Sequence, residues 1–195
     1  MSFEMIYEAV VIGVSAGGLY ALTHILGALP AGFPVPIIVV QHRSRDERFL
    51  LEEVLQTKCN VHIKQADEKE AIQPGIVYFA PADYHLLIEK DQTFSLTFDA
   101  PVNYSRPSID ILFETAAEAY KDHLLGIILT GANKDGAKGM KCIHKRGGTT
   151  IAQRPDTADF PEMPKAAIKT GSIQHVMTLD EIRDFLLDNM KKDDV

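Results

Sequence analysis

A glycine-flanked serine is the first residue of this chain whose type and position indicate catalysis. The segment Gly13-Val-Ser-Ala-Gly17 matches the G-x-S-x-G pattern of a sharp turn between a strand and a helix. The glycines leave room around a raised serine, and the following helix offers backbone N–H donors to an oxyanion. Ser15 is therefore a candidate nucleophile. A helix-capping serine in an ordinary glycine-rich turn remains the alternative.

The same glycines are also compatible with a dinucleotide-binding turn. That kind of fold places an acidic residue about 20 residues further on, at the end of the second strand, to hold a ribose hydroxyl. Here the corresponding strand ends in Gln41-His42. This difference disfavours a nucleotide cofactor, and it supplies an imidazole where a serine nucleophile needs a general base.

His42 and Asp135 complete a possible relay with Ser15. His42 is the histidine expected at the strand end next to Ser15, whereas the others fall on helices, within strands or beside them (His24, His62, His85, His123, His144 and His175). Asp135 follows the apolar segment 124–130 and opens an expected helix. It is predicted either to accept the imidazole Nδ1–H and stabilise the imidazolium, or to cap its own helix.

The elements that must position these residues alternate between strands and helices. Strands are expected at 8–15, 35–40, 61–65, 75–80, 124–130, 149–153 and 173–177, and helices at 19–29, 46–56, 108–120, 135–146, 164–170 and 179–190. Segments 85–89 and 93–98 predict an antiparallel hairpin, and Ser108 is a plausible N-cap. The alternation predicts an α/β fold with a doubly wound, mostly parallel sheet covered on both faces. Sites in such sheets lie beyond the carboxyl ends of the strands, where Ser15, His42 and Asp135 would meet.

Composition limits the classes of function. A chain of 195 residues with 46% hydrophobic residues is expected to form one domain, residues 1–195, with a buried core. It has 27 acidic and 20 basic residues, and this net charge of −7 argues against nonspecific binding of nucleic acid. No stretch approaches the ~20 apolar residues of a membrane span, and no signal segment is evident, so we expect a cytoplasmic protein. Cys59 and Cys142 are expected to be reduced thiols.

A set of motifs runs through the chain from about Ala9 to Leu186. In order, they are Val11-Ile-Gly-Val-Ser-Ala-Gly-Gly18, Gln41-His42, Tyr78-Phe-Ala-Pro-Ala-Asp-Tyr-His85, Arg106-Pro-Ser-Ile-Asp110, Gly126-Ile-Ile-Leu-Thr-Gly131, Asp135-Gly-Ala-Lys-Gly139, Thr150-Ile-Ala-Gln153 and Met163-Pro164. This ordered set resembles the catalytic domain of the CheB family of chemotaxis protein-glutamate methylesterases. The resemblance implies a three-layer α/β fold that hydrolyses methyl esters of glutamate side chains on chemoreceptor helices. Some members of that family also deamidate receptor glutamines.

The resemblance also assigns roles to residues of this chain. It implies that Ser15 is the nucleophile, His42 the base and Asp135 the orienting acid, with no metal or organic cofactor. The backbone N–H groups of Ala16 and Ala132 are the candidates for holding the oxyanion. Arg106 is a candidate for contact with the substrate; steadying the edge of the site or a structural salt bridge are the alternatives.

The chain departs from the common form of the family at several positions. Ala132 stands where methionine is usual, Ala16 where threonine is frequent, and Arg154 where the residue is commonly acidic. Typical members also carry an N-terminal phosphoaccepting receiver domain, whereas only the residues before Glu8 precede the first expected strand. We therefore expect either a stand-alone esterase or a piece of a longer chain. The expected partners are methylated chemoreceptor helices, with a methyltransferase or response regulator as further candidates.

Two other functions remain open from the sequence. One is a serine hydrolase that uses the same site on a small ester, an amide or a protein unrelated to chemotaxis. The other is a binding module that contacts a receptor or methyltransferase without turnover. The intact set of serine, histidine and aspartate disfavours the second, while the choice of substrate depends on exposed loops that sequence patterns do not describe.

Overall fold

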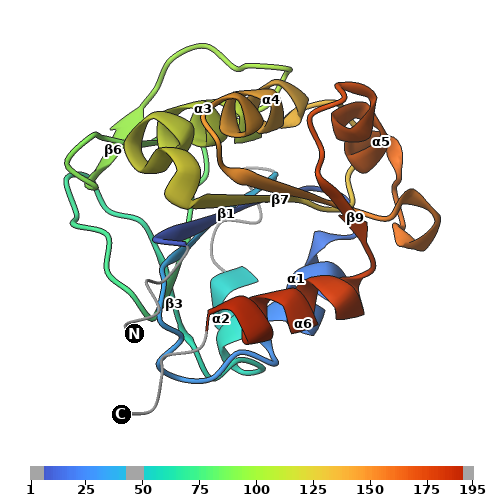
Figure 1. Cartoon of the computed structure of the whole chain (residues 1–195). Coiled ribbons are helices and arrows are strands. Elements are labelled where there is room, and N and C mark those ends of the chain that lie inside the picture. The colour runs from blue at the N-terminus through green and yellow to red at the C-terminus, as the bar shows by residue number, and fades with distance from the viewer. Residues whose placement is uncertain (1–6, 43–50, 191–195) are drawn as a thin grey trace, which may run out of the picture.

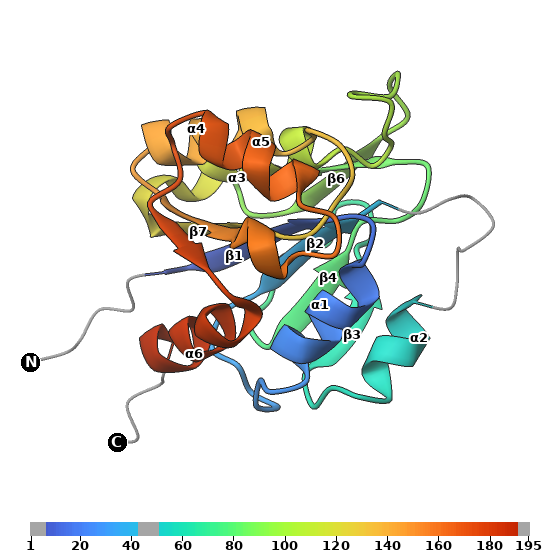
Figure 2. The ribbon, with the colours of Figure 1, turned by 90° about the vertical axis from the view of Figure 1, so that its right-hand side faces the viewer.

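A parallel sheet between two layers of helices organises the chain (Figures 1 and 2). The computed structural model describes residues 7–42 and 51–190. Seven parallel strands lie in the order β3-β4-β2-β1-β7-β8-β9. Their bounds are β1 (Ala9–Val14), β2 (Ile37–Gln41), β3 (His62–Gln65), β4 (Ile76–Phe79), β7 (Leu124–Ile128), β8 (Thr149–Gln153) and β9 (His175–Met177). The predicted hairpin is confirmed as a separate antiparallel pair, β5 (His85–Ile88) and β6 (Phe94–Thr97).

Helices cover both faces of the sheet. On one face lie α3 (Ile109–Tyr120), α4 (Ala137–Lys145) and α5 (Glu162–Lys169). On the other lie α1 (Gly18–Leu26), α2 (Leu51–Gln56) and α6 (Leu179–Asn189). The α/β fold expected from the alternating pattern is therefore confirmed. The predicted helix over 46–56 is seen only from Leu51, because 43–50 lie outside the described residues.

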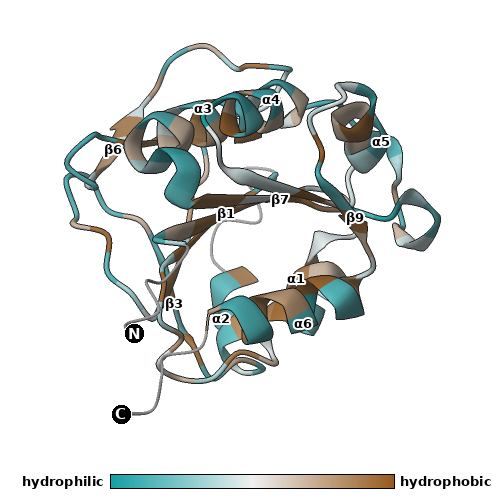
Figure 3. Ribbon diagram, viewed as in Figure 1, coloured by the Kyte–Doolittle hydropathy of each residue, from teal (hydrophilic) through white to brown (hydrophobic). Residues whose placement is uncertain are grey.

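The central strands are apolar throughout because both of their faces are buried. Along β1, Val10, Ile12 and Val14 pack toward α1 and α6, while Ala9 and Val11 pack toward α3. The same alternation of sides recurs along β7. Figure 3 shows the result as hydrophobic strands between helices whose outer faces are hydrophilic. Burying each such side chain contributes about 1.5–3 kcal/mol, so the middle of the sheet is a rigid base for the loops that follow it.

The order of strands determines which loops meet. β1 lies between β2 and β7; the chain first builds the sheet from β1 toward one edge through β2, and later toward the other edge starting with β7. In the register, Val14 pairs with Gln41 of β2, and Gly13 pairs with Ile128 of β7. The residues just after these three strands therefore share one edge, as expected for a site at a topological switch point.

The helices and the cysteines can also be compared with the expectations from composition. Within residues 7–42 and 51–190, none of the helices combines the length and the apolar character needed to cross a membrane. Cys59 and Cys142 are both free thiols, as predicted.

Candidate active site

The turn after β1 presents Ser15 at the edge of the sheet. Gly17 adopts a left-handed conformation (φ 79°), and a Cβ there would lie 2.9 Å from Asp159 Oδ2, so this position requires glycine. The residue at the N-cap of α1 is Gly17, and no side chain caps this helix. The alternative that Ser15 serves as a helix cap is therefore wrong.

Thr130, after β7, braces the serine turn from one side. Its carbonyl accepts the Ser15 N–H at 3.0 Å, and its hydroxyl donates to the Ala16 carbonyl at 2.9 Å. Gln41 braces the turn from the other side, because its Nε2 donates to the carbonyls of Ser15 and His42, both at 2.9 Å. These bonds fix the backbone at Ser15 relative to both neighbouring strands.

His42 and Asp135 form a direct contact. His42 follows β2 beside Ser15, as the register of β1 and β2 requires. Its Nε2 lies 2.8 Å from Asp135 Oδ2, and the two side chains are 11% and 0% exposed. The prediction that Asp135 would bind Nδ1 is wrong: the ring is turned so that Nε2, and not Nδ1, faces the carboxylate.

Asp135 directly precedes the N-cap of α4, but its buried carboxylate lies against the N-terminus of α3. The N-cap of α4 is Gly136 (φ 92°), so the alternative that Asp135 caps α4 is wrong. Ser108 occupies the predicted N-cap position of α3, but its side chain makes no capping bond and donates to Asp135 instead. The Asp135 carboxylate accepts hydrogen bonds from His42 Nε2, Ser108 Oγ, Asn103 Nδ2 and the backbone N–H groups of Ile109, Asp110 and Gly136.

This environment favours the ionised form of Asp135. Burial by itself raises the pKa of the carboxyl, but the hydrogen bonds from His42 and from the Ile109 N–H outweigh it and hold the pKa below its ordinary value. Asp110, which lies behind it, behaves in the opposite way: burial and the nearby charge of Asp135 raise its pKa, against the bond from the Gly139 N–H. Asp135 is therefore the carboxylate that stays charged beside the imidazole.

The first link of the predicted relay is not a hydrogen bond in this structure. Among the described residues, the Ser15 hydroxyl makes no hydrogen bond, so it is not bound to His42. The Nδ1 of His42 instead lies 3.3 Å from Asn133 Nδ2. Ser15 and His42 both line one cleft. Within the described residues, the site thus contains a formed imidazole–carboxylate pair and a serine hydroxyl without a hydrogen bond.

The cleft at Ser15 has a volume of about 740 Å³. Leu19 and Tyr20 of α1 form part of its wall and are 44% and 66% exposed. Leu51 and Val54 of α2 face it, and Lys58 and Asp159 add one charge of each sign. The cleft can therefore accept a mostly apolar chain with a polar group directed at Ser15.

The predicted oxyanion donors lie on the two loops around the serine. In the ranges that the structure describes, the backbone N–H groups of Ala16 and Ala132 donate to no acceptor, so both are available. Gly131 brings these loops together, since a Cβ there would lie 2.5 Å from Met163 Cε and 3.0 Å from Ser15 Cβ. Glycine at position 131 thus permits the close approach.

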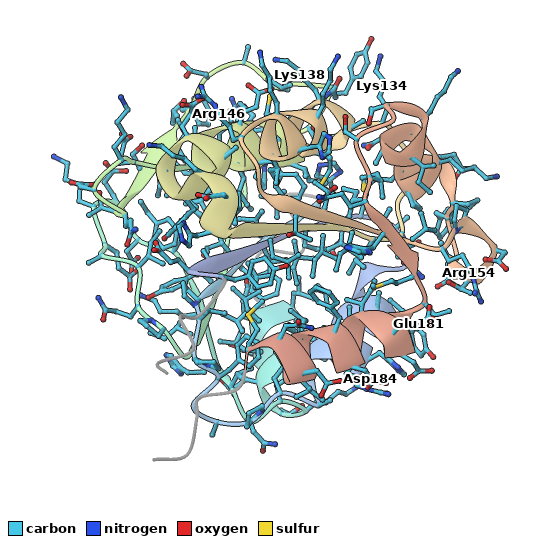
Figure 4. All side chains as sticks on the ribbon, viewed as in Figure 1. Lys134, Lys138, Arg146, Arg154, Glu181 and Asp184 are labelled. Carbon is cyan, nitrogen blue, oxygen red and sulfur yellow. The ribbon has the colours of Figure 1, made fainter. Side chains whose placement is uncertain are left out.

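The two arginines noted in the sequence lie outside the cleft lining. Arg106 donates to the carbonyls of Phe98 and Asp99 at 3.1 and 3.0 Å, and its guanidinium lies 3.7 Å from the centre of the Phe98 ring. It therefore ties the loop after β6 to the segment before Ser108. Arg154 is at the surface, where it pairs with Asp156 (Figure 4).

Several residues that shape the site were not predicted for it. Gln41 was considered only as the end of a strand, and Asn103 and Asn133 were not singled out. The detectable signal for Asn133 is an amide two residues before Asp135, since short polar side chains in such loops commonly bind the backbone two residues on. Lys134, between Asn133 and Asp135 in the sequence, points outward to solvent, as Figure 4 shows.

Comparison with known proteins identifies relatives that match nearly the whole chain. Residues 10–186 match the protein family described as CheB methylesterase. A Leptospira interrogans protein, provisionally named protein-glutamate methylesterase/protein-glutamine glutaminase, is 52% identical over 94% of this chain and 95% of its own length. A Carboxydothermus hydrogenoformans protein-glutamate methylesterase/protein-glutamine glutaminase is 42% identical over 94% of this chain but only 55% of its own length. The crystal structure of the Thermotoga maritima CheB methylesterase catalytic domain superposes with a TM-score of 0.89 at 36% identity, over 93% of this chain and 98% of that one.

Proposed function

Since this chain belongs to the CheB methylesterase family and is a protein-glutamate methylesterase, we propose that it works as a serine hydrolase through Ser15, His42 and Asp135. The observation that supports this mechanism best is the 2.8 Å bond between His42 Nε2 and the buried Asp135, beside the serine turn. The proposed substrates are methyl esters of glutamate side chains on chemoreceptor helices. Receptor glutamines, which differ only in the leaving group, are proposed as further substrates.

In the proposed acylation step, Ser15 Oγ attacks the ester carbonyl while Nδ1 of His42 takes the hydroxyl proton. Asp135 stabilises the imidazolium through the Nε2–H bond. The N–H groups of Ala16 and Ala132 bind the oxyanion of the tetrahedral intermediate. The intermediate then collapses: the bond to the methoxy oxygen breaks, Nδ1 returns the proton, and methanol leaves. A glutamyl ester remains on Ser15.

Deacylation repeats the same proton transfers with water. Water attacks the glutamyl ester as Nδ1 takes one of its protons, and the bond to Ser15 Oγ breaks as that proton passes to the serine. The products are a glutamic acid side chain, which ionises at neutral pH, and the free enzyme. With glutamine as substrate, the first leaving group is ammonia and the second half of the reaction is unchanged.

The cleft supports a neutral ester as substrate. A methyl ester carries no charge, and the wall formed by Leu19, Tyr20, Leu51 and Val54 is apolar or aromatic. Hydrolysis converts the neutral ester into a charged carboxylate. Because a charged group fits this apolar wall less well than the ester does, we expect the product to leave the cleft. We also propose that Arg106 contacts the receptor. A methyltransferase or a response regulator is proposed to control the activity of the enzyme, and the proposed location is the cytoplasm.

The test of this function is methanol release from a methylated chemoreceptor fragment. Wild-type enzyme is expected to release methanol from it and ammonia from the glutamine form, with no methanol from the unmethylated fragment. A small activated ester serves as the comparison substrate. Turnover of the small ester without any release from either receptor form would indicate a hydrolase for another substrate, and no turnover of any of them would indicate a binding module.

A further inference from the structure

The Asn133 amide is held between the backbone of Asp135 and the ring of His42. Its Oδ1 accepts the Asp135 N–H at 3.0 Å, and this bond decides which end of the amide faces the ring. The other end, Nδ2, lies 3.3 Å from His42 Nδ1. Asn133 therefore presents an N–H donor to the imidazole.

The tautomer of His42 follows from its other contact. Asp135 is ionised and can only accept hydrogen bonds, so Nε2 of His42 carries the ring proton. Nδ1 then holds a lone pair, and the Asn133 amide donates to it. The same lone pair has to accept the proton of Ser15 in the proposed reaction. Among the described residues, the Ser15 hydroxyl has no hydrogen bond of its own.

We propose that Asn133 is a positioning residue that occupies the Nδ1 lone pair of His42 in the resting enzyme and yields it to Ser15 when substrate fills the cleft. The inference deepens the proposed serine mechanism. The Asn133 bond keeps the ring in the tautomer that catalysis needs and fixes its rotation. Because an amide N–H faces Nδ1, the bond selects the ring form in which Nδ1 carries the lone pair.

Other charges around His42 are common to the wild type and the variants. In the described part of the chain they are Asp135, Asp110 behind it on α3, and Lys58 and Asp159 on the cleft wall. A change at position 133 leaves these charges in place. Asn133→Ala removes both bonds of the amide, whereas Asn133→Asp keeps an Oδ1 acceptor for the Asp135 N–H and changes only the group facing Nδ1. The matched control is Lys134→Arg, at the neighbouring position that points to solvent (Figure 4).

The pH profile of kcat/KM for methanol release tests the proposal. In Asn133→Ala, the acid limb is expected to move to higher pH by about 0.5–1 unit, the equivalent of one hydrogen bond. In Asn133→Asp, a carboxylate faces Nδ1 and favours the imidazolium, so the limb is expected to move up by about 1–2 units. Lys134→Arg should leave it in place. A purely structural role would lower the rate without moving the limb, and that result would overturn the proposal.

A second readout needs no turnover. In ¹⁵N spectra of the resting enzyme at neutral pH, the Nδ1 resonance of His42 is expected to move downfield in Asn133→Ala, because its lone pair loses a donor. An unmoved resonance would refute the Asn133–His42 bond even if methanol release proceeds as proposed. Conversely, absence of methanol release by wild type with a shifted resonance would refute the proposed function and leave the bond intact.

Discussion

Ser15→Ala is expected to lower methanol release from a methylated receptor fragment by about 10⁴–10⁶-fold, because the serine, histidine and aspartate of such a relay act as a unit. The variant removes only the hydroxyl and keeps the Cβ that lies against Gly131. The free energy of unfolding should therefore stay within about 0.5 kcal/mol of wild type. Initial rates of methanol production, with urea unfolding on the same samples, give both values.

A matched control returns a hydroxyl to the turn in the wrong place. The double variant Ser15→Ala with Ala16→Ser has the same number of hydroxyl groups as wild type, displaced by one residue. It should remain as inactive as the single variant, because attack requires the oxygen at the end of β1. Turnover of Ser15→Ala within tenfold of wild type would remove Ser15 from the mechanism.

Asp135→Asn is expected to lower kcat by about 10³–10⁴-fold, because the amide no longer stabilises the imidazolium or fixes the reactive tautomer. The substitution also places an NH₂ group among donors that now serve a carboxylate, including the Ile109 N–H at 2.7 Å. We expect a loss of roughly 2–4 kcal/mol in the free energy of unfolding. Steady-state kinetics and urea unfolding at neutral pH measure the two effects.

The stability effect should depend on pH in a defined direction. The native pKa of Asp135 lies below its ordinary value. Its contribution to stability is therefore fully present above about pH 4, the ordinary aspartate pKa, and is lost as the pH falls through the lower native pKa. The gap in unfolding free energy between wild type and Asp135→Asn should accordingly shrink below about pH 4.

Asp110→Asn is the control for this variant. Asp110 lies at the same helix terminus, accepts the Gly139 N–H at 2.7 Å and has a raised pKa, so a neutral replacement suits its environment better. Its effect on kcat should be less than about tenfold, since it does not touch the imidazole. Equal losses in Asp110→Asn and Asp135→Asn would mean that the whole cluster is structural and that Asp135 has no separate part in catalysis.

The fold could be predicted from the sequence because each central strand is apolar on both faces. The segments containing β1, β2 and β7 have no other way to bury Val10, Ile12 and their counterparts, and the helices between them force parallel pairing. Once the strands are parallel, Ser15, His42 and Asp135 must come to one edge. The convergence of these three residues follows from topology alone.

The details that depend on side-chain orientation could not be predicted in this way. Which imidazole nitrogen faces Asp135 is decided by the ring rotation, and strand order does not specify it. The capping of α3 by Asp135 arises from packing between the segment at Ser108 and the loop after β7, two segments far apart in the sequence. The role of Arg106 in binding the loop at Phe98 depends equally on tertiary contacts.

Labelling with a serine-directed fluorophosphonate, followed by peptide mass spectrometry, tests most directly whether His42 activates Ser15. The mechanism predicts one adduct per chain, on Ser15, that does not form in folded His42→Ala and forms more slowly when methylated receptor fragment is present. An unlabelled Ser15 in enzyme that releases methanol, or equal labelling of Ser15 in His42→Ala, would contradict it.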